Sequence, residues 1–141
     1  MRDLARPIAL AIIRKGESIL VFPVPDAVKG VTGFRPPGGT IEFGETGAQT
    51  VVREIREELD VEIIDVRYIG TLENIFTYLG KRGHELARIY EARFADSSQY
   101  GRDTFACVEA NGAAFTCVWK AVADLAQGEL YPNGLLDLIA G

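Results

Sequence analysis

Three carboxylates between residues 54 and 58 have a spacing that can hold a metal ion. Glu57 and Glu58 follow Glu54 by three and four residues, so all three project from one side of an α-helix. Like charges at this spacing repel each other by about 0.2–0.5 kcal/mol per pair, and a cation among them offsets that cost. Mg²⁺ prefers oxygen ligands and binds a few carboxylates together with substrate phosphates. The spacing therefore predicts a magnesium site, although a solvated acidic helix face has the same pattern.

The loop before these carboxylates has the composition of a ligand-binding turn. Pro36 and Pro37 stiffen the chain, and Gly38 and Gly39 let the backbone approach a ligand and present its carbonyls. Glu45 precedes the helix and pairs with the opposite charge of Arg53 if the loop folds back. The loop and the helix together form one predicted site.

Segment 39–61 resembles the Nudix box of the MutT-like hydrolases, G-x5-E-x7-R-E-U-x-E-E-x-G-U, in which U is a bulky aliphatic residue. Eight of its positions are filled as required, by Gly39, Glu45, Arg53, Glu54, Ile55, Glu57, Glu58 and Val61. With average residue usage, a chance match at all eight is on the order of one in a million for such a chain. Asp60 stands where the box has glycine. That site usually needs a left-handed conformation, which Asp adopts at a cost of about 1 kcal/mol.

The resemblance implies an α+β fold with α/β/α layers, in which a mixed β-sheet of the Nudix type lies between helices. It also implies hydrolysis of the pyrophosphate bond of a nucleoside diphosphate linked to another group X, with Mg²⁺ or Mn²⁺ as cofactor. X is then of the nucleotide, nucleotide-sugar, ADP-ribose or dinucleotide class. Homodimers are frequent in such families, so a homodimer is possible.

The resemblance also assigns roles to residues of the box. Glu54, Glu57 and Glu58 are the expected metal ligands, together with the backbone carbonyl of Gly38. Glu54 or Glu57 also acts as the base for the attacking water. An ion pair of Arg53 with Glu45 orients the helix against the loop.

Many members of the family take one more carboxylate from a loop outside the box. We expect it to be Glu85, which ends the glycine-flanked segment 80–85 beside His84, the only histidine. The rival carboxylates are Glu73, Glu91 and Glu109.

Candidate substrate-binding residues lie on both sides of the box. Arg35 adjoins the Pro-Pro-Gly-Gly turn, Gly39 belongs to it, and Arg88 follows the segment 80–85. For each arginine, binding of a substrate phosphate and an ordinary role as an exposed surface charge are equally consistent with the sequence. The aromatic residues Phe76, Tyr78 and Tyr90 fit stacking on a base, although aromatic residues that alternate along strands usually belong to the core.

The elements that must position these residues follow from hydrophobic periodicity. A helix over 47–59 is predicted by one apolar stripe and by a capping box of Thr46 with Gln49. Strands are predicted over 8–14, 18–23, 61–71, 74–79, 86–94 and 115–119, and short helices over 122–126 and 135–139. We expect loops at 25–33, 80–85 and 96–112.

Length and charge limit the classes of protein. The 141 residues suit one domain, 1–141, with a net charge of −5. Segment 39–61 holds six acids and two bases, a net of −4, which leaves 14 acids and 13 bases, a net of −1, for the rest. The acidity is local and fits a cation site that attracts a small nucleotide, whereas a nucleic-acid polymer as partner is disfavoured.

Two further features favour a cytoplasmic protein without membrane contact. The apolar run 7–13 is far shorter than the roughly 20 residues that span a bilayer. Cys107 and Cys117 form no CxxC pair, so we expect two buried thiols rather than a disulfide framework or a zinc site.

Two other functions compete with hydrolysis. A catalytically silent nucleotide-sensing module of the same fold would usually lose box carboxylates, and all are present here. A diphosphate isomerase of this fold would use a catalytic cysteine and glutamate, but neither cysteine belongs to a motif for that chemistry.

Overall fold

Long strands and one long helix make up most of the fold of the computed structural model, which describes residues 3–109, 111–126 and 129–140. The strands are β1 (Arg6–Lys15), β2 (Ser18–Asp26), β3 (Val31–Arg35), β4 (Gly38–Thr40), β5 (Ile63–Tyr78), β6 (Lys81–Phe94), β7 (Thr104–Val108) and β8 (Ala114–Ala121). The helices are α1 (Gly47–Leu59) and α2 (Leu135–Ala140), with short 3₁₀ turns η1 (Ser97–Gly101) and η2 (Val122–Asp124).

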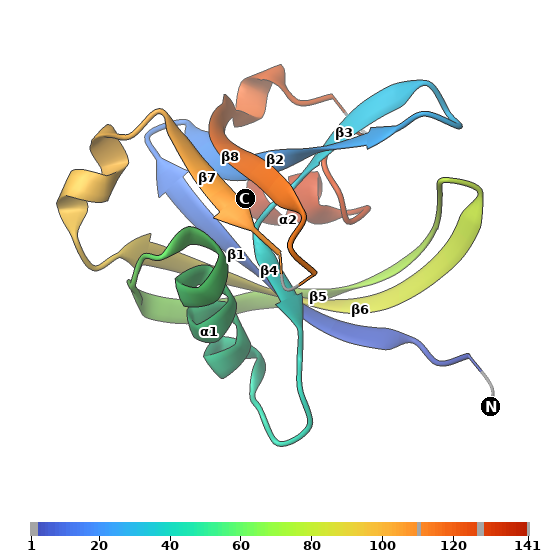
Figure 1. The fold of residues 1–141 in the computed structure, drawn as a ribbon, viewed down its shortest axis with the longest axis horizontal. Coiled ribbons are helices and arrows are strands. Elements are labelled where there is room, and N and C mark those ends of the chain that lie inside the picture. The colour runs from blue at the N-terminus through green and yellow to red at the C-terminus, as the bar shows by residue number, and fades with distance from the viewer. Residues whose placement is uncertain (1–2, 110, 127–128, 141) are drawn as a thin grey trace.

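One mixed sheet connects all the strands. Its order is β5-β6-β1-β2-β8-β7, with β3 paired to β2 and β4 paired to β1. The central strand β1 runs parallel to β6, where Ala9 lies opposite Arg88, and antiparallel to β4, where Ala9 lies opposite Gly39. The turn that carries Gly38 and Gly39 is thereby fixed to the middle of the sheet (Figure 1).

The helix α1 begins and ends where the sequence predicts. Thr46 caps it, because the Thr46 hydroxyl accepts the Gln49 amide at 3.1 Å while the Gln49 side chain accepts the Thr46 amide at 2.9 Å. Asp60 ends it in a left-handed conformation with φ 57° and ψ 39°. The predicted capping box and the strained position of Asp60 are both confirmed.

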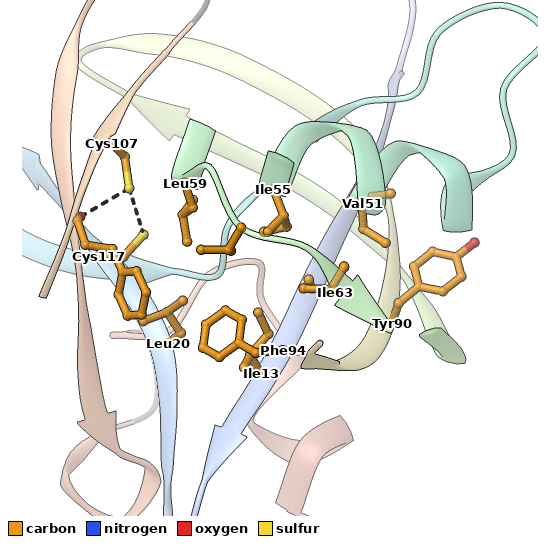
Figure 2. Close-up of a cluster of buried hydrophobic side chains, with 14 residues drawn as sticks. Ile13, Leu20, Val51, Ile55, Leu59, Ile63, Tyr90, Phe94, Cys107 and Cys117 are labelled. Carbon is orange, nitrogen blue, oxygen red and sulfur yellow. Dashed lines mark hydrogen bonds between the residues drawn. The ribbon is translucent and has the colours of Figure 1, made fainter. Parts of the chain in front are cut away.

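Helices cover both faces of the sheet. Val51, Ile55 and Leu59 of α1 pack into a core of residues from the sheet that includes Phe94 and Leu20 (Figure 2). Leu135 and Ile139 of α2 pack into a second core, which contains residues of β1 and β6 that point the other way. The predicted α+β fold with α/β/α layers is confirmed.

Three predicted loops are wrong in part. In 25–33, β2 continues to Asp26 and β3 starts at Val31. In 80–85, the turn is shorter, because β6 begins at Lys81. In 96–112, the turn η1 and the strand β7 replace most of the loop. These segments were predicted as loops because they are rich in small and polar residues. They form strands because pairing with neighbouring strands stabilises them more than their own composition does.

The two cysteines form a buried pair between β7 and β8. Cys107 is 1% exposed and Cys117 is 0% exposed, with their sulfur atoms 3.7 Å apart. The prediction of buried thiols is confirmed (Figure 2). Among the described residues, no helix is long and apolar enough to cross a membrane.

Candidate active site

Arg53 fastens the loop before α1 to the helix. Its Nε and Nη2 donate to the two carboxylate oxygens of Glu45 at 2.7 and 2.9 Å, and Thr50 Oγ1 donates to the same carboxylate at 2.7 Å. These hydrogen bonds, first from Arg53 and then from Thr50, lower the pKa of Glu45 to about 2. The loop thus carries a carboxylate that stays ionised and holds the arginine in place.

The same guanidinium also reaches the carboxylate row on α1. Arg53 Nη1 donates to Glu54 at 2.9 Å and to Glu57 at 3.3 Å, and Arg53 Nη2 donates to the backbone oxygen of Thr40 at 3.3 Å. The pKa of Arg53 is raised, chiefly by its hydrogen bonds to Glu45. The structure therefore brings together Glu45, Arg53, Glu54 and Glu57, as the sequence predicts.

Glu58 lies deeper than its neighbours and is short of partners. Its Oε1 atom is buried and, among the described residues, accepts no hydrogen bond. The pKa of Glu58 is raised to about 9, chiefly by burial and then by the neighbouring carboxylates of Glu54 and Glu109. A buried carboxyl group in this state either holds a proton or needs a cation beside it.

The glycine turn lies directly against the carboxylates. A Cβ atom at Gly39 would lie 2.5 Å from the Glu54 carboxylate carbon. A Cβ atom at Gly38, whose φ is 155°, would collide with the Ala9 backbone oxygen. Both glycines are thus required by close approach, and the turn lies against the acidic face of α1.

The donor set fits a hard divalent cation. Carboxylate and backbone oxygens are the ligands that such ions prefer, and the unsatisfied Oε1 of Glu58 is a ligand without a partner. Among the side chains that the structure describes, no three acids, histidines or cysteines already surround one point. Arg53 holds Glu54 and Glu57 instead, so the exposed Glu57 must rotate to join a cation.

Glu85 does not meet the box carboxylates. It shares its face of β6 with Ala87 and Ile89, which pack in the core of α2, whereas α1 packs on the opposite core. Glu85 is 3% exposed and pairs with Arg6 and, at 3.5 Å, with Arg35. The Glu85 carboxylate therefore forms ion pairs with two arginines rather than with the box.

Glu109, one of the rival carboxylates, directly follows β7, and its charge acts both on Glu58 and on Arg35. Glu91 is instead held by Arg14 and Arg67. The position of Glu109 depends on β7, which the sequence analysis interpreted as part of a loop.

The two candidate arginines occupy different surroundings. The side chain of Arg35 is 25% exposed, and burial lowers its pKa while Glu85 opposes that change. Arg35 contacts Glu85 at 3.5 Å and is also attracted by the charge of Glu109. Arg88 lies over the Tyr68 ring, 4.4 Å from its centroid, and donates to Tyr90 at 3.1 Å.

A profile of the NUDIX domain family matches residues 5–133, nearly the whole chain. The chain belongs to the NUDIX domain family. Part of the chain is 37% identical over 65 residues to the NAD-capped RNA hydrolase NudC of Pseudomonas aeruginosa, and 34% identical to that of Pseudomonas putida. Each match covers 46% of this chain and 23% of the relative. The chain thus matches less than a quarter of the length of these curated relatives.

Solved NUDIX structures share the fold. A MutT NUDIX hydrolase from Burkholderia pseudomallei superimposes with a TM-score of 0.71 at 23% identity, over 97% of this chain and 99% of that one. A UDP-X diphosphatase superimposes with a TM-score of 0.66 at 14% identity, over 99% of this chain and 63% of that one. At these identities, the likeness places the NUDIX box of this chain on a common scaffold.

Proposed function

We propose that the protein hydrolyses the pyrophosphate bond of a nucleoside diphosphate linked to a group X, with Mg²⁺ or Mn²⁺ as cofactor. The observation that carries this proposal is Glu58, a buried carboxyl group with an unsatisfied oxygen beside Glu54. A solvated acidic face would not bury one of its acids against another. This burial supports a cation site over a solvated helix surface.

The residues of the box divide the work. Glu54, Glu57, Glu58 and the Gly38 carbonyl would hold the cation, which when bound neutralises phosphate charge and lowers the pKa of a water molecule. Arg53 keeps Glu54 in place through its 2.9 Å hydrogen bond and is itself held by Glu45. Glu57, whose side chain is 57% exposed, reaches solvent and accepts the proton of the attacking water at a carboxylate oxygen.

Glu109 takes the place that we expected for Glu85. Its charge acts on Glu58 from β7, so it approaches the acidic face from outside the box. Arg35 lies within the field of Glu109 and would contact a substrate phosphate, while Gly39 lets the backbone approach it. Arg88, held by its tyrosines, contributes to the sheet surface instead.

The test is turnover by Glu54→Gln and Glu57→Gln variants. The wild type is screened with Mg²⁺ against nucleoside triphosphates, ADP-ribose, NAD⁺, dinucleoside polyphosphates and nucleotide sugars, and the products are identified. We expect each variant to lose at least about a hundredfold in kcat with an unchanged circular dichroism spectrum. Glu62→Gln, which removes an exposed acid paired with Arg56, is the matched control and should keep full activity. Full activity in both box variants would refute the assignment.

A silent nucleotide-sensing module is the competing outcome of the same screen. It would bind a nucleotide tightly and release neither phosphate nor a nucleoside monophosphate. NAD-type dinucleotides belong in the screen because the curated relatives are named for NAD-capped RNA.

A further inference from the structure

A cavity of about 570 Å³ lies at the tips of two β-hairpins, away from the carboxylates of the box. Lys29 comes from the turn between β2 and β3, and Phe76, Thr77 and Arg82 come from the hairpin of β5 and β6. Asn133, before α2, closes the third side. A volume of this size suits part of a small-molecule ligand.

The cavity is positively charged. Its lining contains Lys29 and Arg82 and no acidic residue. Neither Arg82 nor Lys29 makes an ion pair among the described residues. The charge of Lys29 acts on Asp26, whose carboxylate already accepts three backbone amides. A neighbouring cavity of about 580 Å³ shares Phe76 and Arg82, but there the second arginine, Arg6, is neutralised by Glu85.

Buried Asp26 holds the two hairpin tips together. It is 6% exposed. Its Oδ1 accepts the amides of Val28 and Lys29 at 3.0 and 3.2 Å, and its Oδ2 accepts the Leu79 amide at 3.2 Å. The Asp26 carboxylate thus connects the turn that carries Lys29 to the hairpin that carries Arg82. Both cations line the cavity from segments that these hydrogen bonds hold together.

An aromatic surface adjoins the cations. A Cβ atom at Gly83 would collide with the Phe76 ring, so this ring lies against the backbone of β6. Phe76 is half-buried and lines both cavities. Together with the hydroxyl of Thr77 and the amide of Asn133, the lining suits a ring with an attached anion.

Arg35 lies between the second cavity and the box. It contacts Glu85, which lines that cavity, at 3.5 Å, and it precedes by four residues Gly39, which lies against Glu54. A substrate with its pyrophosphate at the box can therefore extend its other part past Arg35 towards Arg82, which lines both cavities.

We propose that the cavity of Lys29 and Arg82 binds a phosphate group carried by X, so that the preferred substrates have a phosphomonoester in addition to the cleaved pyrophosphate. This inference rests on the proposed hydrolase function. It names the chemical class of X: a second nucleotide with a phosphate on its sugar.

NAD⁺ and NADP⁺ provide the matched pair of probes, because they differ by one phosphate on a ribose. We expect the wild type to hydrolyse NADP⁺ with a kcat/KM about tenfold or more above that for NAD⁺. Lys29→Gln and Arg82→Gln should each lower this ratio several-fold. Lys81→Gln, a cation on the same hairpin that lines neither cavity, should leave the ratio unchanged.

A ratio of one in the wild type, or a ratio that both variants leave intact, overturns the proposal while the hydrolase function stands. If neither dinucleotide is hydrolysed, equilibrium binding of 2′-AMP and of adenosine decides. Tighter binding of 2′-AMP that is lost in Arg82→Gln supports the phosphate site. Equal binding of the two compounds refutes it.

Discussion

Cation binding should release a proton from Glu58. In the absence of a cation, the pKa of this buried carboxyl group is about 9, so at pH 7 only about 1% of it is ionised. A cation that uses Glu58 as a ligand must displace the proton. Cation affinity therefore rises with pH, by about tenfold per unit below pH 9.

The size of the effect follows from the distance to that pKa. Between pH 7 and pH 9 the apparent affinity should change by about fiftyfold, or about 2.3 kcal/mol. The same shift affects stability with the opposite sign. A raised pKa means that the folded state binds more protons than the unfolded one between about pH 4.5 and pH 9, so the metal-free protein loses stability as pH rises through this window.

Isothermal titration calorimetry with Mn²⁺ at pH 7 measures the released proton. The observed enthalpy is plotted against the ionisation enthalpy of two or more buffers, and the slope is the number of protons released. We expect about one for the wild type and about zero for Glu58→Gln. Glu57→Gln, which removes an exposed ligand, should weaken binding and keep the slope. A zero slope in the wild type, or equal affinity at pH 7 and pH 8.5, would refute the role of Glu58.

Three other variants test the supports of the site. Arg53→Lys loses the paired hydrogen bonds to Glu45 and should lower the free energy of unfolding in urea by about 1–3 kcal/mol; an unchanged midpoint contradicts the bracing role. Asp60→Gly relieves the left-handed conformation with φ 57° and should raise that free energy by about 1 kcal/mol, with turnover unaltered; a lower midpoint speaks against strain there. Gly39→Ala places a methyl group 2.5 Å from the Glu54 carboxylate carbon and should reduce turnover at least about tenfold without loss of helix signal. Wild-type turnover in that variant would show that the turn has room to move.

The box helix could be predicted closely because every signal for it is local. The apolar stripe, the capping box of Thr46 and Gln49, and the acid spacing all lie within 15 residues, 46–60, and each depends only on helix geometry. The pairing of Arg53 with Glu45 follows, since the capping box fixes where the loop meets the helix.

The structure places Glu85 away from the box carboxylates, and that placement depends on strand parity, that is, on which face of β6 the residue occupies. Alternation in β6 puts Glu85 on the face of Ala87 and Ile89, away from α1, and extending the pattern of Arg88 and Tyr90 backwards would have shown this. In β7, Phe105 and Cys107 alternate with outward residues, a pattern that could have identified the strand before Glu109.

The burial of Glu58 and the contacts between distant segments could not be predicted. The pKa of Glu58 is raised chiefly by burial and also by Glu109, which is 51 residues away in the chain, and the two hairpin tips are joined by the hydrogen bond from the Leu79 amide to Asp26. Nothing local marks either contact, because it forms only when separate parts of the sheet come together.

The central position of β1 has a consequence for how the protein is made on the ribosome. One edge of β1 pairs with β2 and β4, which come soon after it in the sequence. Its other edge pairs with β6, which is synthesised much later. Eight residues of that edge, from Arg6 to Ile13, find their partners only once Ala92 has been synthesised. During translation an apolar strand therefore stays half paired until two-thirds of the chain exists, and the nascent polypeptide depends on the speed of elongation, or on a chaperone, to keep that edge from pairing with another chain.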